Sequence, residues 1–303
     1  MEDQTPPAIC KICGSDKLLP LFEAQDRLSS PAKEFPVARC PSCEVWSTLP
    51  DMSESEIGEY YPVDYWGTEP TQEWVMRSQT AKLDLLKAFG LHSGRILDVG
   101  CGSGFFLRAL EPDKWNRYGV ETGTEAVNAA RKHLSSDRIY EGQISSLAPT
   151  VGLFDVITLW SCLEHMNEPV RELAAVRNHL KPNGAIIIQV PNAGSYQARF
   201  FKNDWFALDV PRHRHHFCLP ALRSILAPYD LEIIAATTVS REHNLHSLRQ
   251  SLKSRLRRWG NLHKGIYLLV KPFTWPFDRI MSQLGKGATI TVVVKTHDSI
   301  AHD

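Results

Sequence analysis

The central part of the sequence alternates two hydrophobic patterns. Short apolar runs bounded by turn-forming residues are typical of buried strands, and apolar residues at three- and four-residue steps are typical of helices that cover a sheet. The first pattern predicts strands at the start of 95–106 and in 117–120, 154–160, 185–192, 231–239 and 288–296. The second predicts helices in 71–89, 123–134 and 168–180. This alternation indicates an α/β fold with a doubly wound parallel sheet, whose ligands bind outside the carboxyl ends of the strands.

The first predicted helix has an apolar stripe and is preceded by aromatic residues. Trp74, Ala81, Leu85 and Ala88 form the stripe, and Gly90 ends the helix. The preceding segment EYYPVDYWG (59–67) contains three tyrosines, among them Tyr65. We expect these rings either to pack between domains or to form a lid over a bound ligand, in which case Tyr65 contacts the substrate.

Composition places the chain among ordinary globular proteins. It has 303 residues, 43% of them hydrophobic, and 34 Lys and Arg residues balance 34 Asp and Glu residues. The length favours two domains, and the charge balance argues against a nucleic-acid-binding surface over the whole chain. No apolar run reaches the roughly 18 residues of a membrane helix, and the polar start is unlike a signal peptide. We therefore expect a cytoplasmic protein.

Four of the seven cysteines form two CxxC pairs, Cys10 with Cys13 and Cys40 with Cys43. Cysteines of cytosolic proteins are usually free thiols or metal ligands. Each CxxC turn can present two thiolates to one metal, and four thiolates match the tetrahedral coordination of zinc. We predict a structural Zn²⁺ site in a zinc-ribbon-like module, with a redox dithiol or unrelated thiols as the alternatives.

A glycine-rich turn follows the first central strand. Gly100, Gly102 and Gly104 remove side chains where the backbone must turn and approach a ligand. Their spacing differs from the GxGxxG of dinucleotide-binding proteins. Glu121 ends the next strand, and a carboxylate at this place can accept both hydroxyls of a ribose.

These motifs resemble class I S-adenosylmethionine-dependent methyltransferases. The resemblance rests on LDVGCGSG (97–104), Glu121, FDVI (154–157) followed by LEH (163–165), and LKPNGAIIIQVPN (180–192). It implies a seven-stranded, Rossmann-like sheet whose last strand is antiparallel and inserted beside its neighbour. The four-cysteine front end and DVPRH…HF (209–217) are similar to a bacterial group that often modifies sugars, polysaccharide precursors or antibiotics.

The resemblance also implies roles for individual residues. Asp98, Gly100 and Gly102 would line the methionine and ribose part of the cofactor, and Glu121 would hold the ribose diol. Gln143 and Ile144 would lie beside adenine, although many relatives have Asp at the position of Gln143. Trp160 and Ser161 would border the reacting methyl group.

Two segments offer a histidine that could take a proton from the acceptor. His165 follows the fourth strand, and the stretch DVPRHRHHF (209–217) contains His213, His215 and His216. His213 matches the PRH of the similar proteins and is the preferred base, ahead of His216 and His165. We expect His215 to face solvent. Arg212 and Arg214 would bind a phosphate or carboxylate of the acceptor, because guanidinium groups match such anions.

The Glu-x-x-Glu-His metal motif of quinone-precursor O-methyltransferases is incomplete in this sequence, because its first acidic position is Ser161. We therefore predict no catalytic metal.

The segment 241–286 is long for a simple connection between strands. Leucines 245, 248, 252 and 256 and Trp259 suggest an amphipathic helix whose other faces are basic. This helix either packs on the protein or a partner subunit, or rests on anionic lipid through 243–270 at the inner face of the membrane.

Together these features favour an enzyme that methylates a small or carrier-linked molecule, such as a sugar-containing intermediate. The alternatives are an RNA base methyltransferase that uses the zinc module for RNA and a non-catalytic cofactor-binding scaffold. Nucleic acid is not the expected partner, and a homo-oligomer is left open. The expected organisation is a zinc module (1–60), an aromatic linker and helix (61–90), a methyltransferase core (91–240), a basic insertion (241–286) and a final core strand (287–303).

Overall fold

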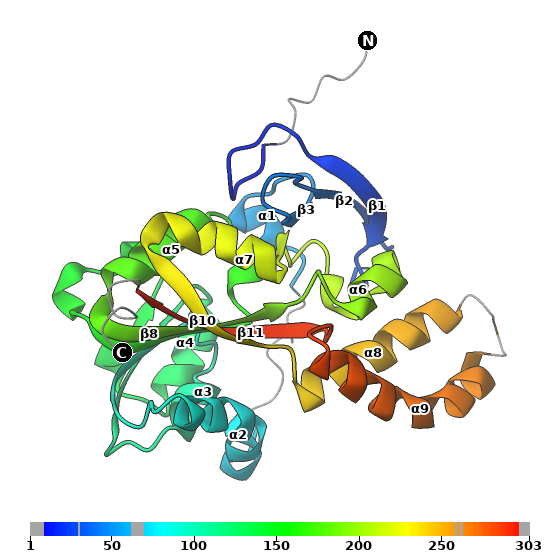
Figure 1. The fold of residues 1–303 in the computed structure, drawn as a ribbon. Helices are drawn as coiled ribbons and strands as arrows, with labels where there is room; N and C mark the ends of the chain where they lie inside the picture. The colour runs from blue at the N-terminus through cyan, green and yellow to red at the C-terminus, as the bar shows by residue number, and fades with distance from the viewer. Residues whose placement is uncertain (1–8, 30, 62–69, 258–259, 261–262, 297–303) are drawn as a thin grey trace.

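The computed structural model describes residues 9–29, 31–61, 70–257, 260 and 263–296 (Figure 1). Its centre is a seven-stranded sheet in the order β10-β11-β8-β7-β4-β5-β6. The strands are β4 (Gly94–Val99), β5 (Trp115–Glu121), β6 (Ile139–Glu141), β7 (Phe154–Trp160), β8 (Leu180–Pro191), β10 (Leu231–Thr237) and β11 (Thr289–Thr296). β11 runs antiparallel to both β8 and β10, and the pairs among β4 to β8 are parallel. The predicted fold class is confirmed, including the inserted antiparallel strand.

Helices cover both faces of this sheet (Figure 1). They are α2 (Gln72–Ala88), α3 (Phe105–Ala109) and α4 (Thr124–Arg131) on one face, and α5 (Pro169–Asn178) and α7 (Leu219–Leu226) on the other. Successive side chains of a strand point to opposite faces. In β8, Ile187 accordingly packs in the same core cluster as Leu86 of α2, whereas Ile186 packs with Leu173 of α5. Apolar runs that are buried on both faces explain why the strands could be predicted.

The helix 71–89 is confirmed, but of its predicted stripe only Leu85 packs against the core. Thr71 caps α2 by accepting a hydrogen bond from the backbone N–H of Trp74, but the Trp74 side chain is 51% exposed. The buried residues are Val75, Gln79 and Leu86. This register also turns Lys82 of α2 toward the sheet, as its contact with Trp160 shows.

A second, four-stranded sheet joins the N-terminal module to the core. Its strands are β1 (Leu19–Gln25), β2 (Glu34–Arg39), β3 (Trp46–Thr48) and β9 (His215–His216), and the short helix α1 (Glu54–Gly58) follows β3. β9 comes from the DVPRHRHHF stretch and pairs with β3. The core therefore completes the sheet of the module.

Short helices connect these elements. They are α6 (Tyr196–Phe201) and the one-turn 3₁₀ helices η1 (Ser136–Arg138), η2 (Ile144–Ser146), η3 (Pro149–Val151), η4 (Leu163–His165), η5 (Lys202–Asp204), η6 (Phe206–Leu208) and η7 (Ala227–Tyr229). η4 directly follows β7, and η2 follows β6, so both lie at the carboxyl edge of the sheet.

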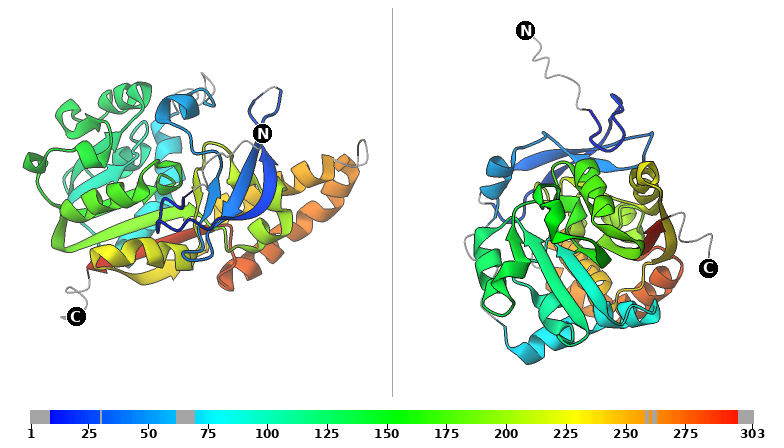
Figure 2. Two further views of the ribbon diagram at one scale, coloured as in Figure 1. Left: turned by 90° about the horizontal axis from the view of Figure 1, so that it is seen from above. Right: turned by 90° about the vertical axis from the view of Figure 1, so that its left-hand side faces the viewer.

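The late insertion forms a pair of packed helices, α8 (Arg241–Leu256) and α9 (His263–Gln283), that extends from one end of the molecule (Figures 1 and 2). The predicted leucine stripe of α8 is not an exposed lipid-facing surface, because Leu248 and Leu256 are buried against the protein. Trp259 lies outside the described residues. None of the helices in the described part of the chain combines the length and hydrophobicity that crossing a bilayer requires.

Candidate active site

The glycine-rich turn at the end of β4 has a backbone that only glycine fits well. Gly100 and Gly104 have φ angles of +70° and +77°, in the left-handed region that favours glycine. A Cβ on Gly100 would lie 2.4 Å from Sγ of Cys162, and a Cβ on Gly104 would lie 2.8 Å from Cδ1 of Leu134. The turn is thus held tightly between the loop after β7 and the residues that follow α4.

Glu121, at the carboxyl end of the neighbouring strand β5, is fixed against this turn. One carboxylate oxygen accepts a hydrogen bond from the backbone N–H of Gly102 at 2.9 Å, and the other accepts from Gly123 at 2.8 Å. The side chain is only 8% exposed. Two hydrogen bonds from the backbone hold the carboxylate in a single orientation before any ligand binds.

Asp98 and Lys82 lie behind the turn as groups of opposite charge, Asp98 buried and Lys82 half-buried. The Thr158 hydroxyl donates to Oδ1 of Asp98 at 2.6 Å, and burial raises the pKa of Asp98 to about 7. Burial lowers the pKa of Lys82 to about 8, against the attraction of Asp98. Lys82 Nζ lies 5.0 Å from the ring centroid of Trp160. Lys82 was not among the residues predicted from the sequence; the available signal was a lysine at an inward position of an amphipathic helix.

The other residues expected near the cofactor lie along the same edge of the sheet. Trp160 ends β7, and its indole N–H is buried without a hydrogen-bond partner among the described residues. Ser161, directly after it, is exposed and has a φ of +51°. Gln143 precedes η2, and Ile144 within η2 is buried. The eight residues that were predicted to line the cofactor site thus lie at or after the carboxyl ends of β4, β5, β6 and β7, on one side of the fold.

Two histidines that the sequence places 48 positions apart meet beside this edge. The rings of His165 and His213 lie 4.6 Å apart, edge to face. Nδ1 of His165 lies 3.0 Å from the carbonyl oxygen of Arg212, and Nδ1 of His213 lies 2.9 Å from the carbonyl oxygen of Ala207. A carbonyl oxygen can only accept, so Nδ1 carries the proton and Nε2 is the basic atom in each neutral ring. Burial lowers the pKa of both rings, that of His165 to about 3.

Glu164 joins the two histidines to form what we call the EHH cluster (Glu164, His165 and His213). One carboxylate oxygen of Glu164 and one ring nitrogen of each histidine lie within 4.8 Å of one another. The Glu164 side chain is 1% exposed, and neither carboxylate oxygen has a hydrogen-bond partner in the described part of the chain. Burial raises the pKa of Glu164 to about 8. The cluster can therefore accept or hold a proton; the absence of a catalytic metal stays a prediction.

His215 and His216 belong to the sheet of the N-terminal module. The expectation that His215 faces solvent is wrong, because β9 buries it. His216 is also buried; its Nε2 lies 3.1 Å from the Thr48 hydroxyl, and its ring lies 6.3 Å from that of His213. Tyr65, the predicted lid residue, lies outside the described residues.

The two arginines of the stretch are internal, and the prediction that they bind the acceptor is wrong. Arg212 is fully buried, and its guanidinium donates to the carboxylates of Asp26 and Asp209 and to the carbonyl of Tyr60. These partners are internal to the protein, so the guanidinium is engaged in structural contacts.

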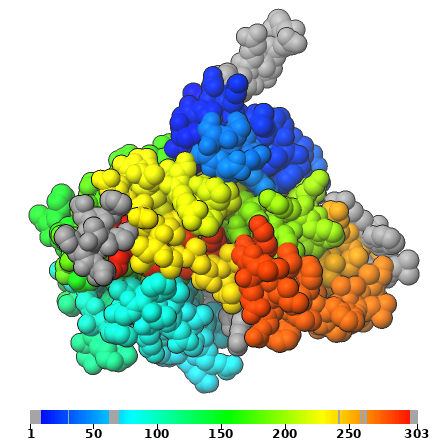
Figure 3. Space-filling model, viewed as in Figure 1, coloured from blue at the N-terminus to red at the C-terminus, as the bar shows by residue number. Residues whose placement is uncertain are grey.

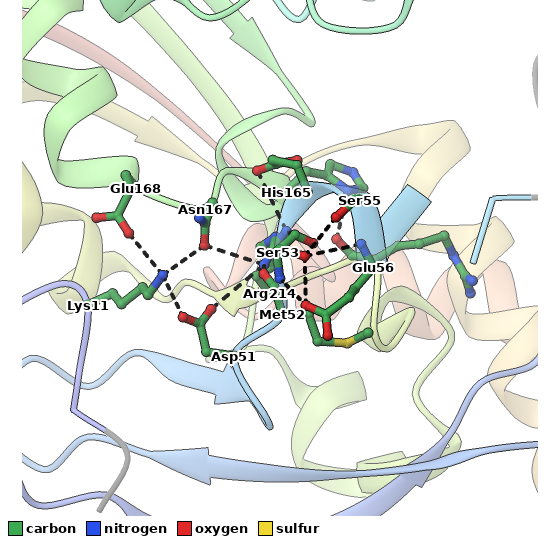
Figure 4. A network of polar contacts seen from close by, with 12 residues as sticks. Lys11, Asp51, Met52, Ser53, Ser55, Glu56, His165, Asn167, Glu168 and Arg214 are labelled. Carbon is green, nitrogen blue, oxygen red and sulfur yellow. Dashed lines mark hydrogen bonds and ion pairs between the residues drawn. The ribbon is translucent and has the colours of Figure 1, made fainter. Parts of the chain in front are cut away.

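Arg214 lies in a second network, which ties the module to the loop after β7 (Figure 4). It donates to the carbonyls of Met52 and Ser53. Nearby, Lys11 Nζ lies 2.7 Å from Asp51 and 2.9 Å from Glu168 (Figure 4). The cationic residues at the start of the module and in DVPRHRHHF thus hold two parts of the chain together.

The four N-terminal cysteines converge as expected for a common metal ligand set. Their Sγ atoms all lie within 4.8 Å of one another, with 3.5 Å between Cys10 and Cys43 and between Cys13 and Cys40. Around zinc, Zn–S bonds of about 2.3 Å would place tetrahedral sulfurs roughly 3.8 Å apart. The observed geometry is close to this arrangement.

Comparison with known proteins identifies the fold and the reaction. A family model described as "Methyltransferase domain" matches residues 73–236, more than half of the chain and all of the strands that form the turn and the carboxylate site. The chain belongs to this family. It is an S-adenosylmethionine-dependent methyltransferase with the class I fold.

Curated relatives and a solved structure agree with this assignment. The ubiquinone biosynthesis O-methyltransferase of Pectobacterium atrosepticum is 24% identical over 219 residues, which cover 69% of this chain and 89% of that protein. Its mitochondrial counterpart from Saccharomyces cerevisiae is 30% identical over 130 residues, covering 40% and 42% of the two chains. A methyltransferase structure from Archaeoglobus fulgidus has a TM-score of 0.50 at 15% identity and covers 75% of this chain and 95% of that one. The structural likeness shows the fold alone.

Proposed function

We propose that this methyltransferase transfers the methyl group of S-adenosylmethionine to a hydroxyl of a small or carrier-linked molecule. The observation that carries the proposal is the position of the EHH cluster. Cys162, whose sulfur packs against Gly100 of the glycine-rich turn, is only two residues from Glu164. A proton-accepting group therefore lies next to the turn that is expected to hold the methyl donor.

The residues present fit this cofactor. Gly100 keeps the turn closely packed against Cys162, the carboxylate of Glu121 is already oriented by backbone N–H groups, and the buried Trp160 indole N–H has no hydrogen-bond partner among the described residues. In our assignment Glu121 binds the ribose hydroxyls, and Gly102 leaves its backbone open to the nucleoside. Lys82 would bind the carboxylate of the methionine part. When bound, S-adenosylmethionine supplies an electrophilic methyl group.

His213 is the residue that we assign as the base. Nε2 of His213 would take the proton that the acceptor hydroxyl loses when its oxygen is methylated. The bond from Nδ1 to the Ala207 carbonyl fixes the tautomer that this step needs. The low pKa that burial imposes keeps the ring neutral at neutral pH. A positioned base of this kind contributes about 10²–10⁴-fold to the rate.

A large cleft near the same edge is where we place the body of the acceptor. It measures about 730 Å³ and lies between the module sheet and the carboxyl ends of β8 and β10, with Trp46, Asn192, Arg199, Cys218 and Thr237 in its lining. Drug-sized ligands typically occupy pockets of about 300–1,000 Å³. The resemblance favours a sugar-containing acceptor, whereas the curated relatives are named for ubiquinone biosynthesis; both kinds of acceptor can carry a hydroxyl group.

We also propose that Cys10, Cys13, Cys40 and Cys43 bind one structural Zn²⁺. Four thiolates leave no open coordination position for catalysis. The cluster packs with the core residues Val45 and Phe217, so the metal would fix the module in the place where it contributes β3 beside His216.

A radiolabelled methyl donor tests the proposed function. The purified protein is incubated with labelled S-adenosylmethionine and a panel of sugar nucleotides, glycolipids and phenolic quinone precursors. Label should appear in a hydroxyl-bearing compound with wild type and fall strongly with His213→Asn. Binding of the cofactor without transfer to any panel member would instead support the scaffold alternative, and transfer only to RNA would support the RNA alternative.

A further inference from the structure

Helix α9 buries its polar side and exposes its apolar side. Thr274, Asp278 and Ser282 recur at every fourth position and are buried. Tyr196 donates to Oδ1 of Asp278 at 3.0 Å, and Asn244 of α8 donates to Oγ of Ser282 at 2.9 Å. The side that faces the protein is thus held by hydrogen bonds between polar groups, the reverse of an ordinary surface helix.

The opposite side of α9 is a continuous apolar stripe. It consists of Leu269, Phe273, Phe277, Ile280 and Leu284, which we call the α9 stripe. Their exposed fractions are 75%, 69%, 50%, 56% and 66%. At 3.6 residues per turn, the five positions fall within about 80° of the helix circumference. Isolated exposed apolar residues are ordinary, whereas a contiguous set of large ones marks a binding surface.

The charge around the stripe is strongly positive. Segment 241–286 contains ten Lys and Arg residues and two acidic residues, although the charges of the chain as a whole balance. One of the two acids, Asp278, is buried. Exposed members of the basic set lie on both helices and at the end of α9: Lys253, Arg257, Lys264, Lys271, Arg279 and Lys286.

We propose that α9 docks on the surface of a membrane that contains anionic phospholipid. The helix would lie in the plane of the bilayer, with the α9 stripe among the upper acyl chains and the basic residues at the phosphate level. Apolar area and attraction to anionic lipid are the two contributions that hold such helices at a membrane. A second copy of the chain is a poorer occupant, because two basic hairpins would face one another across the contact.

The position of the hairpin permits this docking. α8 and α9 project from the end of the molecule and are not covered by the N-terminal module (Figures 1 and 3). The C-terminal end of α9 also borders the large cleft, since Ser282, Gln283 and Lys286 belong to its lining. A membrane-bound hairpin would bring the cleft close to the lipid surface. From the sequence the contact was expected in 243–270, whereas the exposed apolar residues on which this proposal rests lie between Leu269 and Leu284.

Vesicle flotation of the full-length protein tests the proposal. The protein is mixed at low salt with phosphatidylcholine vesicles that contain either no or 30% phosphatidylglycerol. Wild type should float with the anionic vesicles, bind at least tenfold less to the neutral ones, and be released by 0.5 M salt. Failure of wild type to float with anionic vesicles at low salt overturns the proposal.

Matched triple variants separate docking from loss of structure. Leu269→Ser, Phe273→Ser and Leu284→Ser together should reduce flotation at least tenfold. Leu28→Ser, Leu153→Ser and Ile234→Ser alter exposed apolar residues elsewhere and should leave flotation unchanged. Both variants must bind S-adenosylmethionine like the wild type, which checks folding independently of the acceptor. Equal flotation of the two triples overturns the proposal. A wild-type dimer that only the α9 triple converts to monomer, without vesicle binding, assigns the stripe to self-association instead.

Discussion

Arg212 Nη2 donates a hydrogen bond to Oδ1 of Asp26 at 2.8 Å, and both side chains are shielded from solvent. Asp26 follows β1 in the N-terminal module, and Arg212 lies in the loop that leads to β9. The ion pair therefore joins the module to the loop that carries His213. The second partner of Arg212, Asp209, belongs to the same loop, so one guanidinium ties the segment just before the proposed base to the module.

This relationship predicts that removing one partner is costly. Arg212→Gln leaves Asp26 buried without its counter-ion and should reduce the free energy of unfolding by about 3–5 kcal/mol. Urea denaturation measures the change. Arg223→Gln, at an exposed arginine of α7, is the matched control and should change stability by less than about 0.5 kcal/mol. Equal stability of the two variants would contradict the structural role of Arg212.

The fold could be predicted from sequence, but the role of this arginine could not. The run 185–188 is apolar at every position because both faces of its strand are covered, and a turn such as 100–104 has a local glycine pattern. The buried ion-pair partner of Arg212, Asp26, lies 186 positions away in the sequence, and the DVPRHRHHF pattern does not predict this pairing. The same limit applies to His165 and His213, which could be named separately but not placed ring to ring. For α2, the predicted stripe lay one residue before the buried positions, so Lys82 was not recognised as facing inward.

Glu121 should determine cofactor affinity. Glu121→Gln keeps the shape of the side chain but removes the charge that accepts hydrogen bonds from ribose hydroxyls and from the backbone of Gly102. We expect S-adenosylmethionine to bind at least tenfold more weakly, since hydrogen bonds to charged groups contribute about 1.5–3 kcal/mol. Isothermal titration calorimetry measures the affinity. Glu125→Gln, an exposed substitution in α4, should bind like the wild type; unchanged binding by Glu121→Gln would remove the ribose assignment.

His213 should affect turnover and not cofactor binding. His213→Asn should lower kcat by about 10²–10⁴-fold while the Kd for S-adenosylmethionine stays within about twofold. The titratable and charged groups that face His213 are Glu164, His165, His216, Asp209, Arg212 and Arg27, and burial dominates, so its pKa lies below the ordinary 6.5. A base is active when neutral, so the kcat of the wild type should fall only as the pH drops below about 6.5. His92→Asn, an exposed substitution, is the control. Full activity of His213→Asn would rule out this base.

Zinc should be required for the stability of the module. Purified protein should contain one Zn²⁺ per chain, and a strong chelator should lower the thermal midpoint, because metal binding contributes directly to the folding of small zinc modules. Cys10→Ser should abolish zinc binding, measured by elemental analysis. Cys218→Ser, which changes a cysteine outside the cluster, should retain the metal. A zinc-free protein with full stability would contradict the site.

Glu164 should make the stability of the protein depend on pH in a characteristic direction. Burial raises its pKa from 4.5 to about 8, so folding favours the protonated form. Its contribution to stability is complete below pH 4.5 and is lost as the pH rises toward 8. Glu164→Gln keeps a neutral side chain at every pH. Between pH 5 and 8 the free energy of unfolding of the wild type should therefore fall relative to that of Glu164→Gln. The expected fall is on the order of a few kcal/mol, because each unit of pKa shift corresponds to about 1.4 kcal/mol. Urea denaturation at several pH values measures it, with Glu125→Gln as the surface control. If the curves of the wild type and Glu164→Gln run parallel over this range, the carboxylate is not buried and unpartnered as described.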